Sequence, residues 1–325
     1  MTESVVSYLH IYLGPLAPHL DRSDVTDIYV NRPGEIWVET LGGATERHDA
    51  PELTGEHLWR LARQVASIAH QGISREHPLL GARLPDGTRV QVVAPPATRG
   101  PMAIALRKHL SADLSLGDYA AQGAFADTRG TEDAEDADAE LARHYEARDW
   151  AAFLRGAVKA RKTILVSGGT STGKTTFLNA LLREIEPSER LLLIEDTPEL
   201  LLRHENAVGL VAVRGELGES SVTADDLLVA SLRMRPDRII LGELRGAEAF
   251  TFLRAVNTGH PGSLSTVHAD CPDRAVEQLA LMVLQSGANM RRDDVVGYVG
   301  RVVDVVVQLE RCGGIRRVAQ VSWRR

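Results

Sequence analysis

The segment GGTSTGKT at residues 168–175 constrains the fold of this 325-residue chain more than any other feature. It fits the pattern G-x-x-x-x-G-K-[S/T] in full, and it lies between the apolar segment TILVS and the helix-like segment FLNALL. Glycines in such a loop let backbone N–H groups turn toward a phosphate, and the following helix adds the positive end of its dipole. The pattern predicts a phosphate-binding loop between a strand and a helix.

Each residue of this loop has an expected role. Lys174 is expected to place its charge on the β- and γ-phosphate oxygens, and the Thr175 hydroxyl to bind Mg²⁺. The other residues expected around the phosphates are Gly168, Gly169, Thr170, Ser171, Thr172, Gly173 and Thr176. No N-K-x-D guanine signature is present, so ATP is the expected nucleotide.

The C-terminal half, residues 150–325, alternates between strand-like and helix-like segments. The strand candidates are TILVS, LLLIE, VGLVAV, RIILG and SLSTV, and amphipathic segments such as TADDLLVASLRMR separate them. This alternation predicts an α/β domain with a mainly parallel sheet and helices on both faces. The last segment alternates around Gly313-Gly314, which predicts a hairpin.

The N-terminal half, residues 1–110, has a different pattern. VTDIYVN and EIWVET alternate as strands around a Pro-Gly turn, residues 53–70 have apolar positions at helical spacing, and LPDGTRVQVV contains the hairpin signal Asp-Gly. We therefore expect a second, smaller domain of the α+β class.

Residues 111–149 separate the two halves and are rich in alanine, aspartate and glutamate. Residues 127–140 alone hold seven acids and one arginine, so most of the formal charge of −7 is local to them. Such a segment is expected to be an acidic flexible linker, with a regulatory or partner-binding segment as the alternative. The remainder is nearly neutral and carries no basic stripe, so direct nucleic-acid binding is not expected.

The sequence also bears on compartment. No apolar run approaches the roughly 20 residues of a membrane helix, and the N-terminus has no signal-peptide pattern. Cys271 and Cys312 belong to no C-x-x-C motif, so neither a zinc site nor a disulfide framework is expected. We expect a cytoplasmic protein that reaches a membrane only through partners.

A phosphate-binding loop of this kind needs carboxylates for the metal and for the attacking water. At the end of the strand RIILG, where a metal-binding aspartate is usual, stands Gly242, followed by Glu243. The strand LLLI ends in Glu195 and Asp196, with Glu199 one turn later. The acids at the two strand ends are expected to share the tasks of holding the metal and orienting the water. Acids at strand ends are also common without any such role.

Four segments together resemble a known family. GGTSTGKTT, IEDTPEL, LRMRPDRIILGELRGAEAF and NTGHPGSLSTVHA are similar to the secretion-superfamily traffic ATPases, most closely the type IV secretion and conjugative-transfer branch. The resemblance implies a RecA-like core and a hexameric ring. It also implies Glu243 as the catalytic glutamate, Glu195 and Asp196 as an acidic box that holds Mg²⁺ with Thr175, and a histidine box.

The histidine box contains His260 and His268, both expected near the carboxyl edge of the sheet. There His268 is expected to act on the γ-phosphate, although a histidine in a fold is often structural. In the N-terminal domain, RLPDGTRVQVVAPP and ALRK are similar to segments that place arginines on the γ-phosphate. By this resemblance Arg89 and Arg107 are the candidates, with Arg83 a weaker one and a solvated surface role as the alternative.

The expected function is that of an ATP-hydrolysing hexameric motor. It would energise substrate translocation or pilus biogenesis at the cytoplasmic face of the inner membrane, bound to secretion-channel proteins there. Three alternatives stay open. The first is a type II secretion or type IV pilus motor, although many of those carry a tetracysteine zinc insert that this sequence lacks. The others are a nucleic-acid translocase and a nucleotide-gated scaffold.

Overall fold

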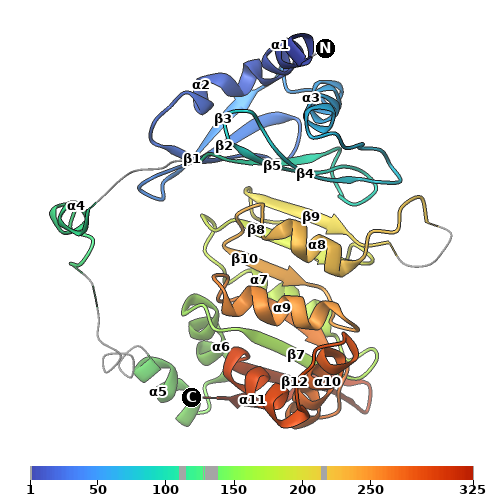
Figure 1. Cartoon of the computed structure of the whole chain (residues 1–325). Coiled ribbons are helices and arrows are strands. Elements are labelled where there is room, and N and C mark those ends of the chain that lie inside the picture. The colour runs from blue at the N-terminus through green and yellow to red at the C-terminus, as the bar shows by residue number, and fades with distance from the viewer. Residues whose placement is uncertain (1, 110–114, 127, 129–137, 214–217, 325) are drawn as a thin grey trace.

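The computed structural model describes residues 2–109, 115–126, 128, 138–213 and 218–324, and the side chains of residues 2–7 are not described. Two sheets lie one above the other, each with its own helices (Figure 1). This two-sheet α/β architecture agrees with the fold predicted from the sequence.

The first sheet has six antiparallel strands in the order β3-β2-β1-β6-β5-β4. Its helices cover the face that points away from the second sheet (Figure 1), because alternate residues such as Ile28, Val38 and Ile104 form a core with them. The elements of this N-terminal domain are α1 (Thr2–Leu13), η1 (Gly14–Leu16), α2 (Ala17–Leu20), β1 (Val25–Val30), β2 (Gly34–Thr40), β3 (Thr45–Ala50), α3 (Gly55–Ile68), β4 (Leu79–Arg83), β5 (Arg89–Val93) and β6 (Ala103–Arg107).

The second sheet has seven strands in the order β13-β12-β7-β11-β10-β8-β9. All neighbours pair in parallel except the final hairpin, β12 with β13, which turns at Gly313-Gly314 as predicted. Its elements are α6 (Trp150–Lys159), β7 (Ile164–Gly168), α7 (Lys174–Leu182), β8 (Leu191–Glu195), β9 (Ala207–Val211), α8 (Ala224–Ser231), β10 (Arg238–Leu241), α9 (Glu248–Asn257), β11 (Leu264–Val267), α10 (Pro272–Gln285), α11 (Arg292–Val302), β12 (Val305–Cys312) and β13 (Ile315–Trp323).

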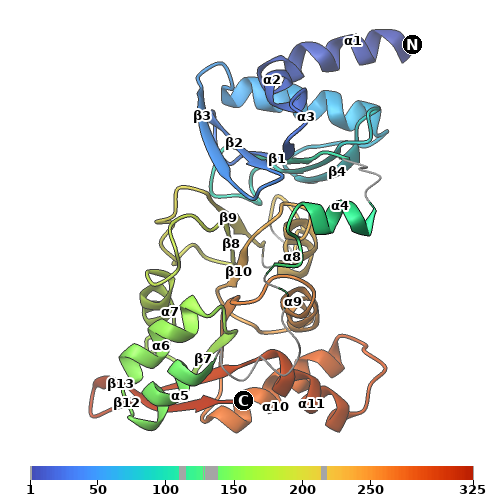
Figure 2. The ribbon, with the colours of Figure 1, turned by 90° about the vertical axis from the view of Figure 1, so that its left-hand side faces the viewer.

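Helices cover both faces of this sheet, as the alternation predicted. In Figure 2, α6 and α7 lie on one side and α8 to α11 on the other. Neighbouring residues of β8 belong to different hydrophobic cores. Leu192 packs with α8 and α9, whereas Leu193 packs with α6 and α7. Burial on both faces explains why the central strands read as continuous apolar runs.

Parallel strands bring their carboxyl ends to one edge, and this edge positions the candidate site. In the sheet order, β11 lies between β7 and β10, and β8 follows β10. The glycine loop follows β7, Glu195 and Asp196 stand at the end of β8, Glu243 follows β10, and His268 follows β11. They therefore meet at the same edge.

The two domains make direct contact. Tyr29 and Trp37, on the face of the first sheet opposite its helices, belong to the same apolar cluster as the α8 and α9 side chains. Arg190 is buried beneath them, donates to Asn31 Oδ1 at 2.7 Å, and lies 3.9 Å from the centre of the Tyr29 ring. The N-terminal domain is thus held on the β8 and β9 side of the second sheet.

Two helices lie within the range predicted as linker. α4 (Leu116–Ala121) is exposed throughout, whereas α5 (Ala139–Glu146) packs on α6 through Leu141, which is 3% exposed. Tyr145 in α5 also donates to the carbonyl oxygen of Val321 at 3.0 Å. Residues from 139 onward therefore pack with the C-terminal domain. Residues 127 and 129–137, most of the acidic run, lie outside the described residues.

Candidate nucleotide site

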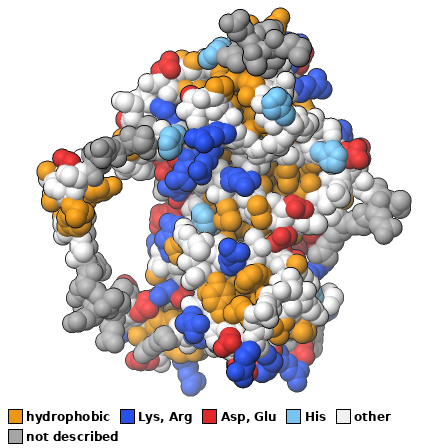
Figure 3. Space-filling model, viewed as in Figure 1, with side chains coloured by type: hydrophobic (Ala, Val, Ile, Leu, Met, Phe, Trp, Pro, Cys, Tyr) orange, Lys and Arg blue, Asp and Glu red, His pale blue; other side chains and the backbone are white. Residues whose placement is uncertain are grey.

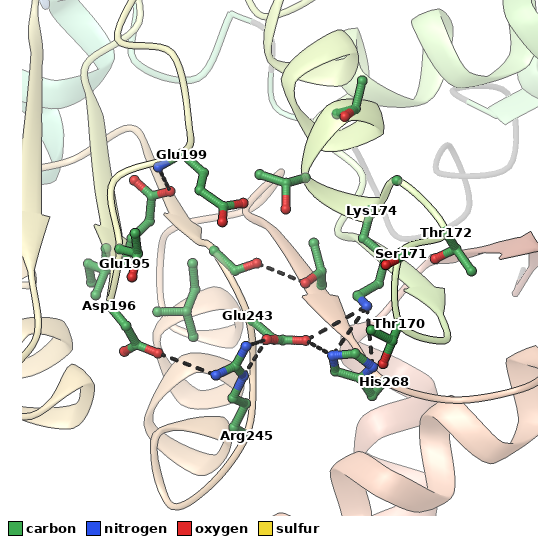
Figure 4. Close-up of a pocket in the computed structure, with 18 of the residues that line it drawn as sticks. Thr170, Ser171, Thr172, Lys174, Glu195, Asp196, Glu199, Glu243, Arg245 and His268 are labelled. Carbon is green, nitrogen blue, oxygen red and sulfur yellow. Dashed lines mark hydrogen bonds and ion pairs between the residues drawn. The ribbon is translucent and has the colours of Figure 1, made fainter. Parts of the chain in front are cut away.

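A cavity of about 740 Å³ opens at the carboxyl edge of the second sheet (Figure 4). It brings together most of the residues that the sequence predicts for ATP and Mg²⁺. Those that line it are Thr170, Ser171, Thr172, Gly173, Lys174, Thr175, Thr176, Glu195, Asp196, Glu243 and His268. Gly168 and Gly169 form the entry to the loop just behind them.

The glycine loop connects β7 to α7 with the backbone conformations that its glycines allow. Gly173 has a φ of 92° and caps α7, so the first amides of that helix face the cavity. Gly168 admits no side chain, because a Cβ there would lie 2.5 Å from Thr172 Oγ1. Ser171 is also left-handed, with a φ of 61°, a conformation that costs a non-glycine residue about 1–3 kcal/mol.

The ammonium of Lys174 lies inside the loop and close to the opposite strand ends. Its Nζ donates to the carbonyl oxygens of Gly168 at 3.0 Å and Gly169 at 3.3 Å, and it lies 3.8 Å from Glu243 Oε1. Burial lowers the pKa of Lys174, the neighbouring Glu243 opposes this shift, and Arg245 adds to it. The ammonium therefore lies between the carbonyl oxygens of the loop and the Glu243 carboxylate.

Glu243 is the centre of a charged cluster (Figure 4). His268 Nε2 lies 2.7 Å from Glu243 Oε1, and Arg245 pairs with the other oxygen of the same carboxylate. Lys174 Nζ lies 3.3 Å from His268 Nε2, so one carboxylate faces three basic side chains. This arrangement holds the Glu243 carboxylate at the cavity wall, opposite the phosphate loop.

The glycine directly after β10, at the position where a metal-binding aspartate is usual, has a steric explanation. A Cβ at Gly242 would lie 2.9 Å from Cγ of Glu195, the last residue of the adjacent strand β8. The Glu195 side chain therefore occupies the space in front of residue 242. That Glu195 and Asp196 share the role of the usual aspartate with Glu243 stays a prediction.

The two acids at the end of β8, Glu195 and Asp196, differ in their surroundings. Glu195 Oε1 accepts hydrogen bonds from the backbone N–H groups of Glu199 at 2.9 Å and Leu200 at 2.8 Å, and Oε2 pairs with Arg99. Asp196 is more exposed, with its Oδ2 3.8 Å from Arg245 Nη1. In this structure both oxygens of Glu195 are engaged by protein groups, although both acids line the cavity.

The two histidines of the predicted histidine box lie at opposite ends of β11. His268 follows the strand and reaches the cavity. His260 precedes it, and its Nδ1 lies 2.9 Å from the carbonyl oxygen of Pro236. The expectation that both lie near the carboxyl edge is wrong for His260, because the strand between them runs from one edge of the sheet to the other.

The predicted arginines lie away from this cavity, which no described residue of the N-terminal domain lines. Arg89 pairs in register with Arg83 on β4 and with Arg107 on β6, so the three form a row across the sheet. Arg83 and Arg89 line a separate groove of about 480 Å³ together with Arg233 of the other domain. Figure 3 shows Lys and Arg side chains gathered near the junction of the two domains.

Two arginines, one lining the cavity and one in contact with a lining residue, were not indicated by the sequence patterns. Arg316, on β13, lines the cavity and donates from Nε to the carbonyl oxygen of Ser171 at 3.1 Å. Arg99, in the segment between β5 and β6, reaches Glu195 from the N-terminal domain. Neither lies in a recognisable motif, and only the folding of the terminal hairpin and the docking of the domains bring them here.

Comparisons with known proteins identify the family. Residues 12–313 match the family model described as "Type II/IV secretion system protein". The chain is 35% identical to the type IV secretion system protein VirB11 of Bartonella henselae, over 99% of this chain and 95% of the relative. It is 41% identical to VirB11 of Brucella suis, over 93% of this chain and 85% of the relative.

A solved structure agrees. The crystal structure of the VirB11 ATPase from the Brucella suis type IV secretion system, in complex with sulphate, superimposes with a TM-score of 0.90 and 39% identity. The superposition covers 97% of each chain. The resemblance predicted from the four motifs is confirmed, and this chain belongs to the type II/IV secretion system protein family, as an ATPase of its type IV secretion branch.

Proposed function

We propose that the cavity at the carboxyl edge binds ATP and Mg²⁺ and hydrolyses ATP, and that the chain works as a ring-shaped motor of a type IV secretion system. One observation carries the site assignment: the glycine loop, Glu243 and His268 line one cavity although they come from three separate segments. The order of β7, β11, β10 and β8 supports a RecA-like core, since one strand separates the loop strand from the Glu243 strand.

In this proposal the loop holds the phosphates. The residues assigned to them are Gly168, Gly169, Thr170, Ser171, Thr172, Gly173, Lys174, Thr175 and Thr176. The first amides of α7 point toward the cavity, and anions are stabilised at such helix ends. Lys174 supplies a point charge that the loop carbonyls already hold in place.

Mg²⁺ fits the oxygen donors at this edge. Within the described part of the chain, no three His, Cys, Asp or Glu side chains gather into a metal-binding cluster. Mg²⁺ usually takes only one or two protein ligands and completes its shell with phosphate oxygens and waters. Thr175 and Asp196 would hold it, with Glu195 behind them, and the ion would neutralise charge on the phosphates.

Glu243 is assigned as the residue that orients and polarises the attacking water. Its carboxylate lies at the cavity wall within 3.8 Å of Lys174 Nζ, so a water beside it would stand next to the phosphate end of the nucleotide. His268 contacts the same carboxylate and the same ammonium. We assign it to the γ-phosphate side of the site, where it would respond to hydrolysis.

Arg89 and Arg107 are assigned to the nucleotide of a neighbouring copy in a hexameric ring. They lie on an exposed part of the first sheet and away from their own cavity, so contact within one chain would require a large displacement of the domain. An arginine finger contributes about 10³–10⁵ in rate. Such an effect would make hydrolysis depend on assembly.

The location of the motor follows from the branch of the family. We place it at the cytoplasmic face of the inner membrane, bound to channel proteins. None of the helices in the described ranges combines the length and the apolar character needed to cross a bilayer. Attachment would therefore use partner proteins.

Mixing two inactive variants tests both the site and the ring. Lys174→Ala removes the phosphate contact but keeps the arginines, and Arg107→Ala does the reverse. Each variant alone is expected to hydrolyse ATP far more slowly than the wild type. A mixture should regain activity, because some interfaces then join an intact loop to an intact arginine.

The same experiment has a built-in control. Mixing Lys174→Ala with Glu243→Gln pairs two defects of the same cavity, so no interface becomes complete and no activity should return. Absence of recovery with Arg107→Ala would contradict the assignment across subunits. Full activity of Lys174→Ala alone would contradict the assignment of the cavity itself.

A further inference from the structure

The segment between β5 and β6 of the N-terminal domain forms backbone hydrogen bonds with the second sheet. Arg99 N donates to the carbonyl oxygen of Gly209 at 2.9 Å, and Val211 N donates to the carbonyl oxygen of Ala97 at 2.9 Å. Thr98 forms an antiparallel bridge with Leu210 on β9, the last strand in the sheet order. The backbone of this segment is therefore attached to the open edge of the ATPase domain.

The side chain of Arg99 continues from this attachment point toward the nucleotide site. It passes directly over Gly209, where a Cβ would lie 2.5 Å from Arg99 Cδ. Its Nη1 donates to the carbonyl oxygen of Leu200 at 2.8 Å, and the guanidinium pairs with Glu195. Glycine at position 209 thus provides the passage that the arginine occupies.

The pair is largely shielded from solvent. The Arg99 side chain is 17% exposed and that of Glu195 is 4% exposed. Burial lowers the pKa of Arg99, which is the expected effect of removing a cation from water. A buried charge of this kind is costly unless it is paired, so Glu195 and Arg99 depend on each other.

Glu195 links Arg99 to the turn that lines the cavity. Its other oxygen accepts the N–H groups of Glu199 and Leu200, the last residues of the turn that follows β8. The same turn carries Asp196 and Glu199 along the cavity wall. One carboxylate therefore joins an arginine of the N-terminal domain to the acidic wall of the nucleotide site.

We propose that Arg99 is a positioning residue of the nucleotide site, which holds the turn of residues 196–200 through Glu195 and so makes binding of ATP with Mg²⁺ depend on the docked N-terminal segment. The inference rests on the proposed function of the cavity. It gives Glu195 a second task, that of a coupling residue between the two domains.

The test compares Arg99→Gln with a matched variant, Arg235→Gln. Arg235 also crosses the domain junction, to Glu39 at 2.5 Å, but it does not line the cavity. We expect Arg99→Gln to raise the KM for ATP about tenfold with little change in kcat, the scale of one lost charge-assisted hydrogen bond. Arg235→Gln should leave the KM unchanged.

Amide hydrogen exchange provides a readout independent of turnover. The N–H groups of Glu199 and Leu200 should exchange faster in Arg99→Gln than in the wild type, and at the wild-type rate in Arg235→Gln. Unchanged protection of these two amides in Arg99→Gln would overturn the inference. If the wild type neither bound nor hydrolysed ATP, the proposed function would fail, while the exchange data would still decide the positioning role.

Two further variants guard against a folding defect. Arg99→Lys keeps the positive charge on a single donor nitrogen but loses the forked geometry of the guanidinium, so it should restore part of the ATP affinity lost in Arg99→Gln. Glu195→Gln removes the ion pair but keeps an acceptor for the amides of the turn. Its effect on KM and that of Arg99→Gln should not add in the double variant, because both break the same link. Additive effects would contradict the link.

Discussion

Gly242 lies against the side chain of Glu195, and the two residues together explain how this site is built. A glycine stands directly after β10, where a metal-binding aspartate is usual, and the side chain of Glu195 at the end of the neighbouring strand β8 fills the space in front of it. Because a Cβ at residue 242 would lie 2.9 Å from Glu195 Cγ, the observed position of the Glu195 side chain requires a glycine at residue 242.

Substitution of Gly242 is therefore expected to be destabilising. Gly242→Ala should cost about 1–3 kcal/mol of unfolding free energy, the usual penalty of overpacking a filled core. Gly242→Asp should be worse, although it places an acid at the usual position, because the larger side chain displaces Glu195. Thermal unfolding measures both. Gly72→Ala is the control, since a Cβ there meets nothing within 4 Å, and an equal loss in that variant would contradict the explanation.

Glu243→Gln is expected to separate binding from turnover. The amide keeps the size of the side chain but cannot take a proton from water, so kcat should fall by about 10²–10⁴. Binding of ATP should persist, because the phosphate loop is untouched. Steady-state hydrolysis and binding of a fluorescent nucleotide check the two parts. Asp270→Asn, an exposed position just beyond His268, should change neither. Wild-type turnover in Glu243→Gln would exclude the assigned role.

Arg316→Ala is expected to weaken ATP binding. The guanidinium lines the cavity and holds the carbonyl oxygen of Ser171, a residue in a left-handed conformation. Loss of this hydrogen bond and of a nearby cation should raise the Kd for ATP about fivefold, equivalent to roughly 1 kcal/mol. The adjacent Arg317 pairs with Glu310 and does not line the cavity. If Arg317→Ala weakened binding equally, a specific role for Arg316 would be untenable.

Much of the site could be predicted because its chemistry is local in the chain. When the strands are parallel, a glycine loop that follows one strand and acids that follow other strands lie at the same edge of the sheet. The position of Glu243 after a strand predicts its place at this edge, whereas His268 is indicated by the resemblance to the histidine box, and both residues line the cavity. The same logic also separates His260 from His268, because residues that flank a single short strand lie at opposite edges of the sheet.

The rest depends on contacts between distant segments. Arg89 and Arg107 lie in recognisable segments, yet their distance from the cavity depends on how the first domain docks, which Arg190 and Arg99 help to fix. Neither of these two arginines has a periodic or motif signal. The packing of α5 was missed for a similar reason: Leu141 follows a run of acids, and only its contact with α6 shows that it is buried.

His260 gives the last prediction, which concerns stability and pH. Burial lowers the pKa of His260 from its ordinary value of 6.5, a shift that its contact with the Pro236 carbonyl only partly opposes. The unfolded chain therefore binds this proton more readily than the folded chain. The free energy of unfolding falls as the pH drops below 6.5, and the residue contributes no pH dependence well above that value.

Urea unfolding at about pH 7.5 and about pH 5.5 tests this effect. The decrease in unfolding free energy between the two pH values should be smaller in His260→Gln than in the wild type. The exposed His77 serves as the control. If the decrease in unfolding free energy between the two pH values were the same in His260→Gln, His77→Gln and the wild type, burial of His260 would have no role in the pH response.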